Sequence, residues 1–391
     1  MKRTKSLQDL AINGAAPAFD ETLHVGRPNI GSRDDFLKYV GDIFDRRWLT
    51  NNGPLVQEFE KRVSDYHEVK HCVAMCNGTV ALEIAIRATG LKGEVIIPSY
   101  TFIATAHALH WQGITPIFAD IDPVTHNLDP EAVRRMITEH STGIIGVHLW
   151  GRSAPAAELQ ELADEHGLRL LFDAAHAFGC SDSGTMIGNF GDCEVLSFHA
   201  TKFFNTFEGG AVLTNDDDLA DTMRLMRNFG FAGLDKVIHP GTNGKMTEIC
   251  AAMGIVNLDS IDVVIDANRR NHQTYQEELS KLRGVSLLDF DESDRQNYQY
   301  VVMEVGRECP VGRDEIVDAL HAENVRARRY FWPSCHNMAP YRELFPEAGK
   351  ELPNTKLVAD RVIVLPTGPT MDEGMVRTVV SIIAASIEDE G

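Results

Sequence analysis

The fold of this chain is decided by one stretch, Glu194-Val-Leu-Ser-Phe-His-Ala-Thr-Lys202-Phe-Phe-Asn-Thr-Phe-Glu208-Gly-Gly-Ala-Val-Leu-Thr-Asn215. It opens with an apolar run, Val195 to Phe198, which is typical of the end of a buried strand. Lys202 follows within a few residues, and the run Ala211 to Leu213 predicts the next strand. A lone lysine in a strand–turn–strand is most often an ordinary surface residue, so the residues upstream must decide whether Lys202 is functional.

A second strand end, upstream of the first, carries a carboxylate. The apolar run Leu170 to Phe172 ends in Asp173, and small residues follow it. The separation of Asp173 from Lys202 suits the ends of two neighbouring strands. Pyridoxal phosphate requires such a pair, because an amine must bind its aldehyde and a carboxylate must keep its pyridine nitrogen protonated. Spacing alone leaves the surface lysine open as the alternative.

The chain resembles the DegT/DnrJ/EryC1/StrS family of sugar aminotransferases in three motifs: Phe172-Asp-Ala-Ala-His-Ala-Phe-Gly179, Ser197-Phe-His-Ala-Thr-Lys202 and Glu208-Gly-Gly210. The resemblance runs from about Gly26 to the C-terminus. It implies the α/β fold of type I pyridoxal-phosphate enzymes, which is a mainly parallel sheet flanked by helices with a smaller C-terminal α+β domain. It also implies pyridoxal 5'-phosphate as the cofactor.

Composition narrows the classes of partner. The 391 residues include 37 Lys and Arg against 57 Asp and Glu, and the resulting net charge of −20 disfavours nucleic acid and anionic membranes. The seven cysteines are scattered and form no C-x-x-C pair, which fits a reducing cytoplasm and argues against a disulfide framework or a metal site. No apolar run approaches the length of a membrane span. We therefore expect a cytoplasmic protein.

The order of patterns along the chain predicts its organisation. Strand and helix patterns alternate, and the strands are almost continuously apolar, which favours a parallel sheet covered on both faces. We expect a loose N-terminal arm over 1–25, a large cofactor-binding domain over 26–262 and a small C-terminal domain over 263–391. Ligands of such sheets lie beyond the carboxyl ends of the strands. The candidates at or just after such ends are Gly78 with Thr79, Phe102, Asp173 and Lys202.

The cofactor's expected contacts combine local pattern and resemblance. A strand, a turn and a helix meet at Gly78 and Thr79, and free N–H groups at a helix start favour an anion. The resemblance assigns these two residues and Ser197 to the cofactor phosphate. It assigns Phe102 to stacking on the ring, and it adds His176, as a bond to the phenolic oxygen, to the catalytic pair Lys202 and Asp173. A core phenylalanine and a core or capping histidine are the alternatives.

Other contacts follow from the resemblance alone. Asn243 and Lys245 match an Asn and a basic residue that reach the cofactor phosphate of the other subunit, which implies a homodimer with shared active sites. Gly244 stands where many members have Tyr, so which of the two makes the contact stays open. The candidate substrate contacts, each of which could equally be an ordinary loop, helix-end or surface residue, are Thr50, Asn51, Arg227, Asn228 and Arg329.

The same family includes a pyridoxamine-dependent sugar dehydratase with His in place of the lysine, so Lys202 favours amine transfer. The resemblance implies L-glutamate as the donor and a nucleotide-linked keto-deoxysugar as the acceptor. The segments 198–205 and 328–333 resemble the branch that converts dTDP-4-keto-6-deoxy-D-glucose to dTDP-4-amino-4,6-dideoxy-D-glucose. The alternatives are a dTDP-3-keto-sugar 3-aminotransferase, an aminocyclitol aminotransferase and, from another class, a non-catalytic regulatory protein on the same fold.

Overall fold

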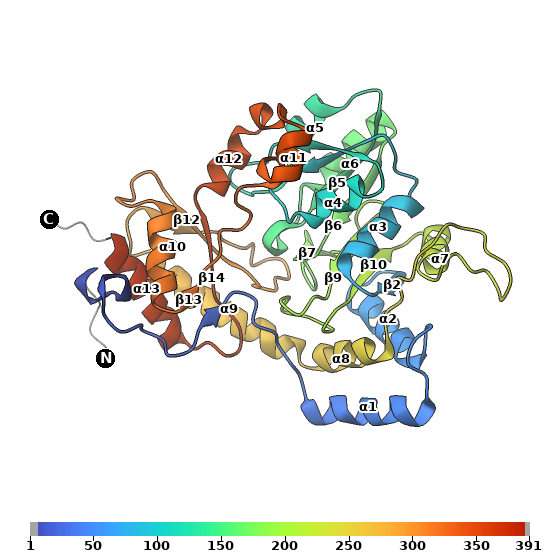
Figure 1. Cartoon of the computed structure of the whole chain (residues 1–391), viewed down its shortest axis with the longest axis horizontal. Coiled ribbons are helices and arrows are strands. Elements are labelled where there is room, and N and C mark those ends of the chain that lie inside the picture. The colour runs from blue at the N-terminus through green and yellow to red at the C-terminus, as the bar shows by residue number, and fades with distance from the viewer. Residues whose placement is uncertain (1–6, 388–391) are drawn as a thin grey trace.

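The computed structural model describes residues 7–387, and its largest unit is a seven-stranded sheet. The strands of this sheet are β2 His71–Met75, β3 Glu94–Pro98, β4 Thr115–Ala119, β5 Ser141–Val147, β6 Arg169–Asp173, β9 Cys193–Ser197 and β10 Gly210–Thr214. Their order is β2-β10-β9-β6-β5-β3-β4 (Figure 1). Strand β10 is antiparallel to both neighbours, and the other pairs are parallel. The mainly parallel sheet predicted from the sequence is confirmed.

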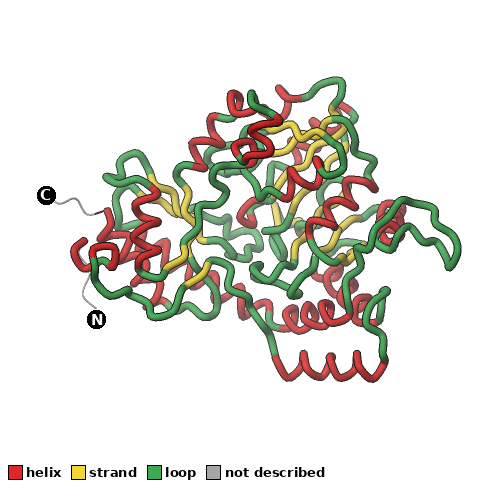
Figure 2. The backbone as a smooth tube through the Cα atoms, in the orientation of Figure 1, coloured by secondary structure: helices red, strands yellow, loops and turns green. Residues whose placement is uncertain are grey.

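Helices cover both faces of this sheet (Figure 2). They are α2 Pro54–Tyr66, α3 Gly78–Ala88, α4 Ala104–His110, α5 Pro130–Met136, α6 Ala156–His166, α7 Asp217–Met226 and α8 Glu248–Asp259. One face packs against α3, α4 and α7. The opposite face packs against α5 and α6 at one end and against α2 and α8 at the other. Because both faces are buried, the strands are almost continuously apolar instead of alternating.

A second, smaller sheet forms in the C-terminal third of the chain. Its strands, in antiparallel order, are β11 Val285–Leu287, β12 Val301–Val305 and β14 Val362–Leu365. The helices that share its core are α9 Ile261–Leu279, α10 Arg313–Ala322 and α13 Glu373–Ile387. The domain boundary expected between residues 262 and 263 falls in the first turn of α9, which leads from α8 into this unit (Figure 1).

The remaining elements connect the two sheets or lie at the edge of the molecule. They are α1 Arg33–Arg46, the hairpin strands β7 Ser181–Asp182 and β8 Thr185–Met186, and the helices α11 Ala339–Leu344 and α12 Pro353–Ala359. Helix α1 lies along α8 (Figure 1). Tyr341 of α11 is fully buried and meets Phe118 of β4 edge-on at 5.6 Å. The C-terminal part of the chain therefore returns to pack on the large sheet.

The N-terminal arm differs from our expectation of a loose segment over 1–25. Strand β1, Leu23–His24, pairs in parallel with β13, Val325–Arg326. Leu10 is fully buried in the core of the smaller sheet, and the backbone N–H groups of Ala11 and Ala18 donate to the Glu323 carboxylate. Residues 1–6 lie outside the described residues. The arm is held by partners about 300 positions away, so no local pattern could have revealed its packing.

The carboxyl ends of β2, β3, β5, β6 and β9 meet at one edge of the large sheet, and β10 begins there (Figure 1). Gly210, the first residue of β10, approaches the start of α3 closely. A Cβ atom at Gly210 would lie 2.6 Å from the backbone N of Gly78. Glycine at position 210 is therefore needed to bring β10 against the start of α3, which borders this edge.

A buried contact between a histidine and a glutamate supports the same edge from inside the molecule. The side chains of His148 and Glu194 are both fully buried, and His148 Nε2 lies 2.9 Å from Glu194 Oε2. The other oxygen of Glu194 accepts the backbone N–H groups of Gly188 and Phe190, at 2.6 and 2.8 Å. His148 Nδ1 accepts the backbone N–H of Ala154 at 2.9 Å. These contacts connect His148, which follows β5, and Glu194, at the start of β9, to the loop between β8 and β9.

We expect Glu194→Ala to lower the free energy of unfolding by about 2–6 kcal/mol, because the change leaves the backbone N–H groups of Gly188 and Phe190 buried without their acceptor, at a cost of about 1–3 kcal/mol each. Glu194→Gln, which keeps one acceptor, should fall between wild type and Glu194→Ala. Urea unfolding followed by circular dichroism measures the difference. The matched control is Asp65→Ala, which removes an exposed ion pair with Lys61 and should cost less than about 1 kcal/mol. Equal midpoints for Glu194→Ala and the control would contradict the supporting role.

Candidate active site

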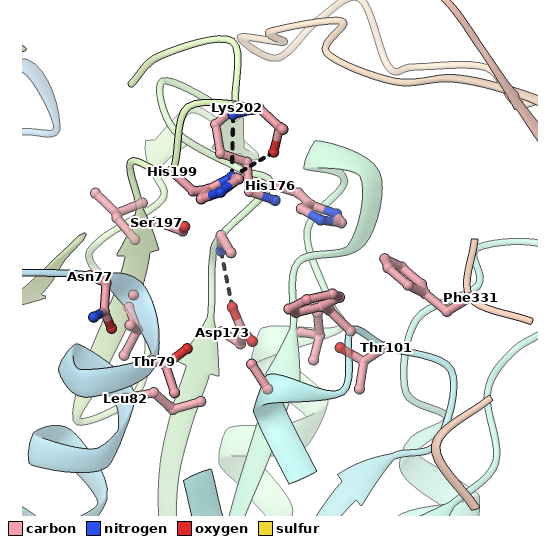
Figure 3. Close-up of a pocket in the computed structure, with 18 of the residues that line it drawn as sticks. Asn77, Thr79, Leu82, Thr101, Asp173, His176, Ser197, His199, Lys202 and Phe331 are labelled. Atoms are coloured by element: carbon pink, nitrogen blue, oxygen red, sulfur yellow. Dashed lines mark hydrogen bonds between the residues drawn. The ribbon is translucent and has the colours of Figure 1, made fainter. Parts of the chain in front are cut away.

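A cavity of about 350 Å³ opens at the edge where the strands of the large sheet end (Figure 3). Several sequence-predicted residues line it, and they come from segments far apart in the chain. They are Gly78, Thr79, Phe102, Asp173, His176, Ser197 and Lys202. The prediction that these strand ends meet is confirmed. The individual roles assigned to the residues stay predictions.

Lys202 lies in the turn that follows β9, where its backbone N–H donates to the His199 carbonyl at 2.8 Å. Its side chain enters the cavity, and Nζ lies 3.3 Å from the Tyr300 hydroxyl. Burial lowers the pKa of Lys202 to about 8, and the attraction of Asp173 opposes this shift. Near neutral pH a useful fraction of the amine is therefore uncharged, as a nucleophile or a general base must be.

Asp173 closes the cavity from below at the end of β6. Its carboxylate accepts the Thr105 hydroxyl at 2.8 Å and the backbone N–H of Ala175 at 3.1 Å, which fixes its orientation. Burial raises the pKa of Asp173, while these two hydrogen bonds and Lys202 act in the opposite direction. Figure 3 shows Asp173 and Lys202 on opposite sides of the cavity. A flat ring between them would meet a carboxylate on one side and an amine on the other.

The start of α3 forms the side of the cavity that suits an anion. The Asn77 side chain caps this helix by accepting the N–H of Val80 at 2.8 Å. The N–H groups of Gly78 and Thr79 find no acceptor within the described part of the chain. The hydroxyl-bearing side chains of Thr79 and Ser197 line the same cavity. Two free N–H groups, two hydroxyls and the positive end of the helix fit a phosphate group.

His176 presents a hydrogen-bond donor to the cavity. The backbone N–H of Trp150 donates to His176 Nδ1 at 3.3 Å, so the proton of the neutral ring is on Nε2. Burial, together with the nearby Lys202 charge, holds the pKa of His176 well below its usual range. The ring is therefore neutral, and its Nε2–H is available for the phenolic oxygen predicted as its partner. Phe102 lies at the rim with 56% of its surface exposed, which leaves its ring open for stacking.

Seven residues of the predicted site lie outside the cavity of their own chain, and three of them, Asn228, Asn243 and Lys245, cluster together. Asn228 and Asn243 pair across a short bridge, and Lys245 Nζ donates to the Asn228 side chain at 3.1 Å. Gly244 is buried between them and the helix core, and a Cβ there would come within 3.1 Å of Val80 and closer still to Ile84. A larger residue at position 244 would therefore crowd α3. Asn243 is exposed at the surface beside this cluster.

Arg227, predicted as a substrate contact, is buried in a structural network within its own chain. Its guanidinium donates to Glu60, to the Ala74 carbonyl at 2.7 Å and to Asn52 at 3.1 Å. Thr50 and Asn51 directly precede Asn52 in the loop between α1 and α2, outside the cavity. For one chain alone, the structure assigns Arg227 to the packing of this loop. Substrate contact by Thr50 and Asn51 stays a prediction.

Sequence reasoning missed the contributions of Thr105, Tyr300 and Tyr330 to the site. Thr105 does not line the cavity, but it orients Asp173; its only signal was a Thr-x-x-x-Thr spacing at the start of a helix. Tyr300 and Tyr330 come from the segments around the smaller sheet, and burial raises the pKa of both phenols. These two side chains reach the cavity because of how the two sheets pack together. No local sequence pattern predicts that packing.

Among residues 7–387, no group of three or more His, Cys, Asp and Glu side chains is arranged to hold a metal ion. Of the helices that the structure describes, none combines the length and the apolar character needed to cross a membrane.

The lowered pKa of Lys202 can be tested on cofactor-free protein. The rate at which an acylating reagent modifies Lys202 should be half-maximal near pH 8, because only the neutral amine reacts. Ordinary surface lysines should reach half-maximal rates near about pH 10.4. Peptide mass spectrometry across a pH series measures both in one sample, and Lys202→Arg identifies the correct peptide. A Lys202 profile that coincides with the surface lysines would contradict the assigned environment.

Known proteins match this chain over almost its whole length. A model of the DegT/DnrJ/EryC1/StrS aminotransferase family matches residues 31–384. The dTDP-4-amino-4,6-dideoxy-D-glucose transaminase of Shigella dysenteriae is 34% identical over 364 residues, which cover 93% of this chain and 99% of that protein. The GDP-perosamine synthase of Caulobacter vibrioides is 36% identical over 311 residues, which cover 78% and 84%.

Solved structures agree with the sequence matches. The crystal structure of DesI in the presence of its TDP-sugar product superposes with a TM-score of 0.93 at 49% identity, covering 97% of this chain and 96% of that chain. The expected fold, cofactor and family are confirmed. The chain belongs to the DegT/DnrJ/EryC1/StrS aminotransferase family and is a pyridoxal-phosphate-dependent sugar aminotransferase.

Proposed function

We propose that this enzyme moves an amino group from L-glutamate to dTDP-4-keto-6-deoxy-D-glucose in the cytoplasm, giving dTDP-4-amino-4,6-dideoxy-D-glucose. The observation that carries the chemistry is the pair Lys202 and Asp173 facing one cavity. The proposed substrate is supported by the names of relatives from Shigella dysenteriae and Escherichia coli and by the TDP-sugar product of DesI. A GDP-linked 4-keto sugar is the second candidate, since the GDP-perosamine synthase of Caulobacter vibrioides is 36% identical.

In this proposal, different cavity residues hold different parts of the cofactor. Pyridoxal phosphate, when bound, supplies an aldehyde that carries the amino group and a ring that accepts electrons. The free N–H groups of Gly78 and Thr79, with the Ser197 hydroxyl, hold its phosphate. Asp173 keeps the ring nitrogen protonated, and His176 donates to the phenolic oxygen. Phe102 covers the ring at the open side of the cavity.

Lys202 is the group that moves protons. Its Nζ has a pKa lowered to about 8 and donates a hydrogen bond to the Tyr300 hydroxyl. In its neutral form it can take the proton from the α-carbon of glutamate and return it to the neighbouring carbon of the cofactor. In the second half-reaction it runs the same transfer in reverse toward the sugar carbon. Removal of this amine leaves the site without a base at that position.

We further propose that two copies of the chain complete each other's active sites. Asn243 and Lys245 lie outside their own cavity, as residues that serve a partner's cofactor phosphate would. Large apolar side chains are also exposed on α1, on the loop after it and on the loop after α7: Phe44 is 71% exposed, Leu49 is 60% and Leu234 is 95%. Exposed apolar side chains of this size are suited to burial against a second copy of the chain.

The substrate is tested by single-turnover reactions of the amine-loaded enzyme with a panel of sugars. The dTDP-linked 4-keto sugar should react at least tenfold faster than a dTDP-linked 3-keto sugar and than a GDP-linked 4-keto sugar. Recovery of the visible absorbance band gives the rate, and mass spectrometry identifies the product. Lys202→Ala, which lacks the band, is the control. Faster reaction with the GDP-linked sugar would replace the proposed substrate, and no reaction with any sugar would overturn the proposal.

Thr105→Val should lower kcat/KM about tenfold or more, because it removes one hydrogen bond to a buried carboxylate while keeping the side-chain shape. The lost bond had lowered the pKa of Asp173, so that pKa rises and the acid limb of the pH–rate profile moves to higher pH. Thr105→Ser, which keeps the donor, should behave like wild type. Steady-state rates from pH 5 to 9 measure both effects. An unshifted acid limb in Thr105→Val would contradict the positioning role.

A further inference from the structure

A chain of hydrogen bonds runs from the smaller sheet to His176 in the active site. It begins at Glu304 of β12, whose carboxylate lies 3.0 Å from His126 Nε2. The Trp150 indole N–H donates to His126 Nδ1 at 3.2 Å, and the Trp150 backbone N–H donates to His176 Nδ1 at 3.3 Å. His176 lines the cavity, whereas the other three residues stand behind its wall. The chain of bonds therefore ends at the group proposed to bond the cofactor's phenolic oxygen.

Each of these bonds fixes a tautomer, because an indole or backbone N–H can only donate. His126 Nδ1 accepts from Trp150, so the proton of the His126 ring is on Nε2, where the Glu304 carboxylate accepts it. The side chain of His126 is fully buried, and that of Glu304 is 23% exposed. In the same way, the Trp150 N–H leaves Nε2–H of His176 as the donor that faces the cavity. Both histidine rings therefore have a defined proton position.

Trp150 is held by its surroundings in a backbone conformation that bulky residues rarely adopt. Its φ is 63°, in the left-handed region. The side chain is fully buried and stacks on Phe331 at 5.4 Å with an interplanar angle of 9°. Nε1 is the only polar atom of a tryptophan side chain, so the bond to His126 is the directional contact that fixes the indole. Loss of that bond would let the backbone N–H that holds His176 move.

The backbone of His176 is fixed by another contact, so the chain of bonds acts on its ring. The His176 carbonyl accepts the Asn297 side chain at 2.9 Å. The ring centroid lies 4.5 Å from that of Tyr300 and 5.9 Å from that of Phe331, on the same side of the cavity as Phe331 (Figure 3). These aromatic contacts do not distinguish the two ring nitrogens. Among residues 7–387, the bond from Trp150 is the contact that does so.

We propose that His126 and Glu304 are positioning residues, which act through Trp150 to hold the Nε2–H of His176 toward the cofactor's phenolic oxygen. Neither of them touches the reacting atoms. This inference rests on the proposed function, because it assumes the role given there to His176. It also couples the smaller unit to the chemistry: Glu304 is carried by β12, so a displacement of the smaller sheet would loosen a donor at the cofactor.

The first test follows the indole N–H in cofactor-free protein by nuclear magnetic resonance. The chain has four tryptophans, and three of them are 45% or more exposed: Trp48, Trp111 and Trp332. With isotope-labelled tryptophan, the slowly exchanging indole signal should therefore belong to Trp150, and Trp150→Phe should remove it. Its exchange with solvent should be about tenfold faster or more in His126→Phe and in Glu304→Leu. Glu304→Gln, which keeps an acceptor oxygen, should exchange at the wild-type rate.

The second test follows the visible absorbance band of the cofactor-loaded protein across a pH series. A hydrogen bond donated to the phenolic oxygen favours the form of the cofactor that has lost its proton. His126→Phe and Glu304→Leu should therefore move the midpoint of the band's pH dependence upward, by about half a unit or more. His176→Phe, which removes the donor itself, should give the largest shift. Glu304→Gln should keep the wild-type midpoint, and circular dichroism checks that each variant is folded.

The matched control is Tyr275→Phe, which removes a buried hydrogen bond elsewhere in the smaller unit. The Tyr275 hydroxyl donates to the Pro366 carbonyl at 3.1 Å, and the side chain is fully buried. Tyr275 belongs to a different apolar cluster from Trp150. Indole exchange and the band midpoint should both match wild type in this variant. Changes equal to those in His126→Phe would overturn the proposal, since they would reflect a general loosening of the fold.

The remaining outcomes are distinct. Unchanged indole exchange in both His126→Phe and Glu304→Leu would overturn the proposal. Faster exchange with an unshifted band midpoint would show a structural contact that has no effect at the cofactor, which also overturns it. No shift in His176→Phe would overturn the role proposed for His176 and this inference with it. Failure of wild type to aminate any nucleotide sugar would overturn the proposed substrate alone, because neither readout uses a sugar.

Discussion

Burial shifts the pKa values of two groups that face the same cavity in opposite directions, and the rest of the site depends on these two shifts. It lowers the pKa of Lys202 and raises that of Asp173, because charge is unfavourable in a low-dielectric interior. Each group would be costly alone, but each favours the charge of the other. The pairing of β6 with β9 keeps their two strand ends adjacent. A cofactor ring with a protonated nitrogen fits this arrangement, since it gives the carboxylate a cation while the amine stays neutral.

The two sheets contribute different parts of the site. The large sheet supplies the groups that we propose to bind the cofactor and move protons, all of them at its carboxyl edge. The segments around the smaller sheet supply Tyr300, Tyr330 and the loop that follows β13, which border the cavity. In the proposed mechanism, chemistry and selectivity are therefore carried by different stretches of chain. Relatives can share the first and differ in the second, which is consistent with family members named for both dTDP- and GDP-linked sugars.

The sequence predicted what depends on local pattern and not what depends on distant contacts. Lys202, Asp173 and the helix start at Gly78 each sit at the end of an apolar run, so periodicity located them. Thr105 acts on Asp173 from a different strand–helix unit, and Arg227 is bound to Glu60 across the sheet edge, so neither role could be predicted locally. The packing of the N-terminal arm was missed for the same reason. Local patterns place functional groups on elements, and only the fold shows which groups meet.

The pairing of β1 with β13 links the N-terminal arm to the loop that carries Tyr330 and Phe331 into the cavity wall, since β13 ends at Arg326. A shortened protein that starts after His24 would lose this strand together with the anchor at Leu10. It would then display an unprotected strand edge and an empty apolar hollow, two features that promote self-association. Solubility of such a truncated version would therefore suffer, although none of residues 7–24 lines the cavity.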